Sequence, residues 1–371
     1  MSDAQLLSKL APTGRRYFPT LDALRLLAFG KTFLAHVQLG SFPVLDQVRR
    51  GSGLGVPFFF VLSGFLITYL ACLEKKETGK LRLKHFYWRR VLRIWPLYYT
   101  VVALGLAIPW LLQWLNQQGS FEGYAPTWWV SGLFLDNYKT MWLRESPSVS
   151  VLAVLWSVCV EEHFYIVWGL LIAFVPLRYM KWVLGGGIVM GLCCRIAYAH
   201  LGIIPLDLPT RIDLFAWGGV PALLLVQNRK RAEDASRRIP VFLGWAYLLF
   251  TMAFAWQVGM APLYNSMWYL SAAGAVFSGL LFLLLAPVRP WQLSATNPLC
   301  RLGFYTYGLY MWHEVGHGVA KRTFQWLHWP LTEPVNAIGY LAMALLLTIG
   351  LALVSFRIIE RPFLCLKHKF Q

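Results

Sequence analysis

Long apolar segments recur from one end of this chain to the other. A membrane-spanning helix needs about 20 predominantly apolar residues, and runs of that length occupy most of the 371-residue sequence. We therefore expect an all-α, polytopic membrane protein with about ten transmembrane helices. The expected spans are 20–40, 54–73, 91–114, 149–175, 182–200, 212–227, 240–258, 266–287, 303–319 and 336–358. The apolar stretch 127–135 is too short to cross and is expected to be interfacial or re-entrant.

The composition argues against a large soluble core. Only 14% of the residues are charged, against about a quarter in soluble domains. The 59 aromatic residues, made up of 18 Trp, 17 Tyr and 24 Phe, fit belts at two membrane interfaces. The six cysteines show neither CxxC nor Cys/His metal spacing, which favours no disulfide framework. We expect one membrane domain over 1–371, beginning with a polar segment of about 18 residues that is no cleavable signal.

The basic residues are distributed unevenly between the two sides of this ten-span arrangement. With both termini cytoplasmic, 22 of the 34 Lys and Arg residues fall on the cytoplasmic side and seven on the other. Such asymmetry is typical of membrane proteins. It explains the formal charge of +17 without a nucleic acid or other polyanion partner. We expect a multi-pass protein of the inner or plasma membrane, and the oligomeric state stays open.

The first expected span carries ionisable residues at membrane depth, where such groups are costly and often functional. Asp22 and Arg25 are three residues apart and should be neighbours on one helix. Arg25 and His36 are eleven apart, which places them on one face, about 16 Å from each other along the axis. The alternative for Arg25 is a structural role, as a partner of Glu161. For His36 alone, the alternative is a satisfied packing residue.

The fourth and ninth spans also hold polar residues. Glu161 and Glu162 are adjacent in an apolar helix and point about 100° apart, which predicts different partners. His313 and His317 have a spacing that can bind metal, but no Cys or carboxylate cluster supports this, so we expect none. Further candidates for a substrate or channel lining are Ser63, Trp156, Ser157, Tyr165, Tyr310, His313 and Glu360.

A basic face precedes the third expected span. Arg89, Arg90 and Arg93 lie three and four residues apart and should converge on one side of a helix, with Lys84 just before them. The planar arginine fork binds two oxygens at once and suits phosphate. The alternative is anchoring to anionic lipid. The helical spacing of the arginines favours a phosphate-bearing ligand.

Taken in order, these motifs resemble the membrane-bound acyltransferase-3 family of bacteria and some animals. The resemblance runs from residue 19 to residue 363. It rests on Asp22-x2-Arg25-x10-His36, the run from Phe58 to Ile67, Arg89/Arg90/Arg93, Trp156-Ser157-x3-Glu161, Tyr310-Met311-Trp312-His313 and Glu360-Arg361-Pro362. Ala23 and Leu26 stand where the family usually has glycine, and Val158 where it has leucine. The family's optional esterase-like SGNH-type domain is not expected after the tenth span.

The resemblance implies an O-acetyltransferase that moves an acyl group, most often acetyl, from acyl-CoA to a hydroxyl. The acceptor would be a sugar, surface polysaccharide, glycolipid or other small molecule. It also implies that the Arg25–His36 pair is essential. We expect Arg89, Arg90, Arg93 and Lys84 to bind acyl-CoA, which is the co-substrate. We expect no metal cofactor. His36 would act as the base, Asp22 or Glu161 would orient it or offset charge, and Arg25 would stabilise the oxyanion or hold the thioester arm.

Other mechanisms and functions remain open at this stage. A covalent acyl-enzyme on Tyr165 or Ser63 is a variant of the same reaction. The main rival function is a transporter or flippase, whose intramembrane charges would line a translocation path. Inverted repeats would support it, and none is evident. A non-catalytic scaffold gives no reason to bury His36, Glu161 and His313 together with an arginine face.

Overall fold

The computed structural model describes residues 17–37, 52–114, 123–257 and 267–367, and these residues form an all-helical protein. The helices are α2 (Pro19–Ala35), α4 (Gly55–Thr78), α5 (Leu83–Trp114), α6 (Trp128–Gly132), α7 (Asp136–Leu143), α8 (Ser150–Ala153), α9 (Leu155–Phe174), α10 (Met180–His200), α11 (Leu208–Gln227), α12 (Arg229–Arg238), α13 (Val241–Gln257), α14 (Tyr269–Leu283), α15 (Pro298–Gly303), α16 (Thr306–Trp326), α17 (Pro334–Ser355) and α18 (Arg361–Leu366). A π-helical turn, Phe356–Glu360, joins the last two. The polar segment expected over 1–18 lies almost wholly outside the described residues.

Each of the ten expected apolar spans coincides with a helix. Five helical stretches are long and apolar enough to cross a membrane, or six if α12 and α13, bent by 88°, form one span. The all-α membrane class is thus confirmed, whereas ten crossings are not. The shortfall has a physical cause. The helix α2 has 17 residues and α14 has 15, while α11 and α16 carry charged or polar side chains within their apolar stretch.

The centre of the bundle is the close pair α4 and α11. A Cβ added at Gly64 would come within 2.0 Å of the Phe215 backbone, and one at Gly218 within 1.9 Å of the Val61 carbonyl oxygen. Small residues allow such direct contact of helix backbones in membrane proteins. Two glycines on opposite helices therefore fix α4, which carries Ser63, against α11.

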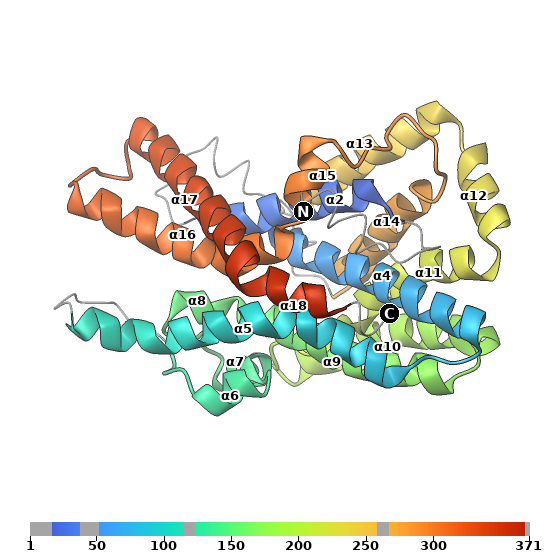
Figure 1. Ribbon diagram of the computed structural model, residues 1–371, viewed down its shortest axis with the longest axis horizontal. Helices are drawn as coiled ribbons and strands as arrows, with labels where there is room; N and C mark the ends of the chain where they lie inside the picture. Colours follow the sequence, from blue (N-terminus) through green and yellow to red (C-terminus); the bar gives the residue numbers. More distant parts are fainter. Residues whose placement is uncertain (1–16, 38–51, 115–122, 258–266, 368–371) are drawn as a thin grey trace.

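The charged helix α2 lies inside the bundle, in contact with α4, α15 and α16. Its approach to α15 is close enough that a Cβ at Gly303 would meet the Asp22 carbonyl oxygen at 1.9 Å. The helices α16 and α17 pack against each other as a pair that runs out to one end of the molecule (Figure 1). This arrangement brings the ionisable residues of α2 and α16 together in the interior.

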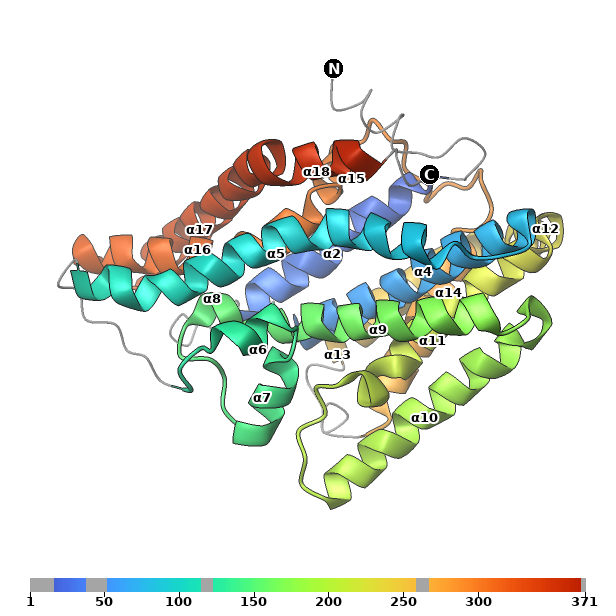
Figure 2. The same cartoon turned by 60° about the horizontal axis from the view of Figure 1, so that its bottom comes forward.

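The segment after α5 returns to the bundle as two short helices. Figure 2 shows α6 and α7 beneath α5 and α9, while α10 lies at the outer edge. The hydroxyl of Tyr98 on α5 donates to the Ser131 carbonyl oxygen at 2.7 Å, and the Ser131 hydroxyl donates to Asp136 at 2.9 Å. The expected non-spanning segment 127–135 is thus a five-residue helix and its flanks, held by buried polar contacts.

Candidate active site

A cavity of about 330 Å³ lies between α2, α4, α5, α9, α16 and the π-helical turn, and we call it the central cavity. Its size is within the range of small-molecule sites. Most of the residues singled out from the sequence line it: Asp22, Arg25, Ser63, Arg89, Arg90, Arg93, Ser157, Glu161, Tyr165, Tyr310 and Glu360. Residues more than 300 positions apart therefore meet in one space.

Four arginines, Arg25, Arg89, Arg90 and Arg93, form what we call the arginine end of the cavity. Arg25 is paired with Asp22 at 2.6 Å and Arg89 with Glu74 at 2.7 Å. Arg90 lies 5.9 Å from the Tyr165 ring centroid, and its Nε is buried without a hydrogen-bond partner. Among the described residues, neither Arg90 nor Arg93 forms an ion pair. These side chains line the central cavity, where a ligand can reach them.

Glu161 lies on the cavity wall and joins α4 to α9. Its carboxylate accepts hydrogen bonds from the hydroxyls of Ser63 and Tyr165, each at 2.8 Å. The contact with Tyr165 is the i,i+4 neighbour that the sequence predicts. Glu162 instead accepts from the Trp95 indole at 3.2 Å, so the prediction of different partners for the two carboxylates is confirmed. The alternative pairing of Arg25 with Glu161 is not formed in the described structure.

Tyr310 and Ser157 line the cavity and contact each other. Their hydroxyl oxygens are 2.6 Å apart, and the Tyr310 hydroxyl also donates to the Val154 carbonyl oxygen at 3.1 Å. The Tyr310 ring packs against Phe59 at a centroid distance of 6.0 Å. These contacts join α16 to α9. His313, one helical turn further along α16, lies beyond them.

Three residues, His36, His313 and Glu314, form what we call the histidine cluster. Glu314 Oε1 lies 3.9 Å from His36 Nε2 and 3.9 Å from His313 Nε2. The ligand atoms of the three side chains all lie within 4.8 Å of one another. His36 follows α2 as its C-cap residue, so the expected helix between Arg25 and His36 is present up to its end. The cluster therefore lies at the C-terminal end of α2, away from Arg25.

Although the spacing of His313 and His317 can bind metal, we expect none there, and the structure gives the two histidines different partners. His317 Nε2 lies 3.2 Å from the Phe33 carbonyl oxygen and its Nδ1 lies 2.9 Å from the Tyr340 hydroxyl. Both of its ring nitrogens are therefore already used. His313, in contrast, has Glu314 beside it and His36 opposite.

The sequence candidates that do not line the cavity are His36, His313, Trp156 and Lys84. Trp156 packs edge-on against Phe60 at a centroid distance of 6.3 Å, and Lys84 is exposed. Sequence reasoning missed the lining residues Tyr17, Phe59 and Tyr307, and it gave no role to Glu314. Glu314 could have been selected because it is adjacent to His313 in the sequence. No charge or spacing pattern singled out Tyr17, Phe59 or Tyr307.

Glu360 owes its position to the π-helical turn. The turn follows α17 directly, and such turns are frequent at functional sites. One carboxylate oxygen of Glu360 is buried without a hydrogen-bond partner in the described structure, and the residue lines the cavity. The backbone widens at this turn before Pro362 and carries Glu360 to the cavity.

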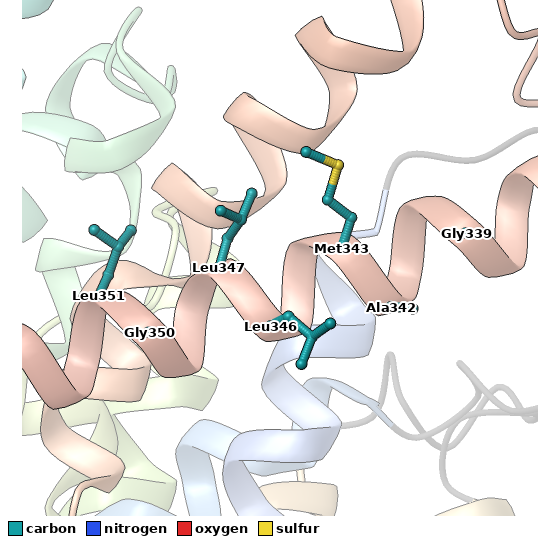
Figure 3. A pocket seen from close by; sticks show the side chains of 7 residues that line it. All are labelled: Gly339, Ala342, Met343, Leu346, Leu347, Gly350 and Leu351. Atoms are coloured by element: carbon teal, nitrogen blue, oxygen red, sulfur yellow. The ribbon is translucent and has the colours of Figure 1, made fainter.

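A second hollow lies along α17 and has a different character. Figure 3 shows it lined by Gly339, Ala342, Met343, Leu346, Leu347, Gly350 and Leu351. All of these residues are apolar, and the hollow lies on the surface of one helix. Such a face suits contact with lipid and offers no group for chemistry. The central cavity is therefore the candidate active site.

The helices and the central cavity define an integral membrane protein with a buried, arginine-lined binding space. The chain belongs to the acyltransferase domain family, whose profile matches residues 18–355. The match covers both the arginine end and the histidine cluster, in agreement with the resemblance seen in the sequence. No solved structure matches the chain.

Three characterised or named relatives cover most of this chain. It is 26% identical to the peptidoglycan O-acetyltransferase OatA of Listeria monocytogenes and to the O-acetyltransferase OatA of Staphylococcus aureus. It is 27% identical to the putative peptidoglycan O-acetyltransferase YrhL of Bacillus subtilis. Each alignment covers 94% of this chain but only 55–57% of the relative. The chain thus spans just over half the length of these proteins.

Proposed function

We propose that this protein is a membrane O-acetyltransferase that moves an acetyl group from cytoplasmic acetyl-CoA to a hydroxyl of a cell-surface sugar. The observation that carries the proposal is the arginine end of the central cavity, within the acyltransferase domain. CoA carries phosphates, and arginine suits phosphate through two-oxygen contacts. The names of the relatives support a sugar acceptor, with peptidoglycan as the first glycan to test.

The proposed topology has ten crossings with both termini in the cytoplasm. The ten expected spans all coincide with helices, and the positive-inside asymmetry supports this orientation. Arg89, Arg90 and Arg93 then face the compartment that holds CoA. Charged helices such as α2 would cross inside the bundle, where their ionisable side chains have protein partners.

The proposed reaction takes place between the arginine end and the histidine cluster. The phosphates bind Arg90 and Arg93, and the thioester arm extends along the cavity toward Tyr310 and Ser157. Arg25 and His36 are about 16 Å apart along α2, a distance that an extended thioester arm can cover. Arg25 holds this arm, with Asp22 fixing the guanidinium.

His36 is the proposed general base. The acceptor hydroxyl oxygen attacks the thioester carbonyl carbon, the carbon–sulfur bond breaks, and His36 takes the hydroxyl proton. The leaving thiolate then receives that proton, which gives CoA and the acetylated sugar. The side chain of His36 is 37% exposed, which leaves it accessible to an acceptor. Tyr310 and Ser157 separate it from the cavity and must admit the acetyl group.

The direct test is a reaction with the purified, lipid-reconstituted protein. We expect radioactive acetyl groups to pass from acetyl-CoA to a peptidoglycan or surface-glycan extract, with slow hydrolysis of acetyl-CoA when no acceptor is present. A transporter would show neither reaction. Mass spectrometry of surface glycans from a deletion strain would identify the acceptor, and an unchanged glycan profile together with no turnover in vitro would contradict the proposal.

A further inference from the structure

The described acceptor atoms of the histidine cluster face one another, and the donor to Glu314 is the side chain of Ser150, outside the three groups. His36 Nδ1 lies 2.9 Å from the Thr32 carbonyl oxygen, and His313 Nδ1 lies 2.5 Å from the Tyr310 carbonyl oxygen. A carbonyl oxygen only accepts, so each Nδ1 carries the proton of a neutral ring. The two Nε2 atoms are then lone pairs, and both face the carboxylate of Glu314.

This arrangement can take up one proton between the three groups. His313 is fully buried at 0% exposure, and its Nε2 has no hydrogen-bond partner among the described residues. A buried polar atom without a partner is destabilising. His317 provides a contrast on the same helix. Both nitrogens of His317 have partners, whereas the Nε2 of His313 has none in the described structure.

We infer that His36, His313 and Glu314 together hold the proton that is removed from the acceptor hydroxyl, with Glu314 as the residue that stabilises it. The inference rests on the proposed function. A proton on His36 Nε2 would point at Glu314 Oε1, and closing their 3.9 Å separation by about 1 Å would form a charge-assisted hydrogen bond. Catalytic hydrogen bonds are commonly this loose before substrate binds.

The proton balance of the reaction fits this assignment. The acceptor hydroxyl releases one proton as its oxygen forms the ester bond, and the CoA thiolate takes one proton after the carbon–sulfur bond breaks. Between these events one proton must be stored. The described titratable groups facing His36 are His313, Glu314 and His317 from α16, and of these Glu314 is the only anion when ionised. The carboxylate and the stored proton neutralise each other inside the bundle.

A divalent metal ion is the competing occupant of the same three groups. Zinc is held at about 2.0–2.1 Å from histidine nitrogens, which places tetrahedral ligand atoms roughly 3.3 Å from one another. The cluster atoms are spread over as much as 4.8 Å. A proton needs only two of the three acceptors at a time, and the reaction itself delivers it. The geometry therefore favours the proton.

The first experiment compares pH–rate profiles of acetyl-CoA turnover for the lipid-reconstituted wild type and Glu314→Gln. Gln keeps the size of the side chain and removes its charge. We expect kcat to fall about tenfold to a hundredfold with an unchanged acetyl-CoA KM. We also expect the acid limb of the profile to move to lower pH, since a nearby carboxylate stabilises the protonated base. Glu314→Asp should restore part of the loss.

The control is Glu333→Gln, which removes an exposed carboxylate before α17 and should leave the profile unchanged. A Glu314→Gln profile that matches the wild type in both kcat and position would overturn the proposal. The same holds if purified wild type contains one metal ion per chain that Glu314→Gln loses, because the cluster would then be a metal site.

A second measurement does not depend on turnover and separates this inference from the proposed function. Nitrogen-15 NMR of histidine-labelled protein reports the protonation of each Nε2 as pH is lowered. Protonation shared with Glu314 should occur at lower pH in Glu314→Gln than in the wild type. That shift in a protein that transfers no acetyl group would refute the proposed function and leave the proton site standing, whereas identical titrations would refute the proton site.

Discussion

The two ends of the candidate site are incomplete in opposite ways. At the arginine end, Arg90 and Arg93 are cations without carboxylate partners among the described residues. At the histidine cluster, acceptor atoms of His36, His313 and Glu314 face one another, and none of the three side chains donates to another in the described structure. One end is suited to an anion that comes from outside the protein, and the other to a proton.

One buried charge elsewhere in the bundle, Arg195, has a complete set of partners. Arg195 on α10 donates to both carboxylate oxygens of Asp213, at 2.8 and 2.7 Å, and also to the Thr210 carbonyl oxygen and the Ser271 hydroxyl. Such a pair holds helices together and leaves no capacity for a ligand. This pair shows that a buried charge by itself does not mark a ligand site.

The largest effect should come from His36→Ala. Loss of the base should lower kcat by about 100-fold to 10,000-fold, while the acetyl-CoA affinity stays within twofold because the arginine end is intact. Turnover and CoA binding by isothermal titration calorimetry would measure the two quantities. If His36→Ala retains near-normal turnover in a folded protein, the assignment of base catalysis to the histidine cluster is wrong.

Arg93→Ala should show the reverse pattern. Removing one charged hydrogen-bonding group from a phosphate site costs about 1.5–3 kcal/mol, so we expect the apparent acetyl-CoA KM to rise about tenfold to a hundredfold with a smaller change in kcat. Arg93→Lys should recover only part of this, because lysine lacks the planar fork. Arg229→Ala is the control, since that side chain is exposed on α12 and paired with Glu233. An unchanged KM in Arg93→Ala would remove CoA from the arginine end.

Tyr310→Phe tests the boundary between the two ends. The change removes one hydroxyl that contacts Ser157 and the Val154 carbonyl oxygen, at a cost of about 1 kcal/mol. We expect kcat to change several-fold with KM unaffected. Tyr307→Phe is a matched control, because its hydroxyl donates to the Ile94 carbonyl oxygen within the same cavity wall. Equal effects of the two changes would show that Tyr310 does not separate the acetyl-CoA site from the histidine cluster.

The features predicted well from the sequence are those set by helical geometry. The Asp22–Arg25 contact, the shared face of Glu161 and Tyr165 and the continuous α2 up to its C-cap His36 follow from residue spacing. The convergence of Arg89, Arg90 and Arg93 on one cavity follows from the same rule. Local periodicity decides these relations before any helix packs on another.

What could not be predicted depends on tertiary packing. The bond from Ser63 to Glu161 joins residues 98 positions apart, and that from Ser157 to Tyr310 joins residues 153 apart. The distance of 3.9 Å between Glu314 and His36 depends on how α16 lies against α2. The π-helical turn that carries Glu360 inward likewise has no simple sequence signature. Spacing along one helix contains no information on which face of a second helix it will meet.

Lys84→Ala should have the smallest effect on the acetyl-CoA KM. It tests whether the donor site extends beyond the arginine end. The resemblance assigns Lys84 to acyl-CoA binding, yet its side chain is exposed and lies outside the lining of the central cavity. Its contribution would then be a general attraction for the anionic ligand, which salt screens over about 8–10 Å. We expect less than a twofold rise in KM at low ionic strength and none at 0.5 M salt, measured beside Arg93→Ala. A rise that matches Arg93→Ala and persists in salt would instead place a CoA phosphate in direct contact with Lys84, and the donor site would continue along α5 beyond the cavity.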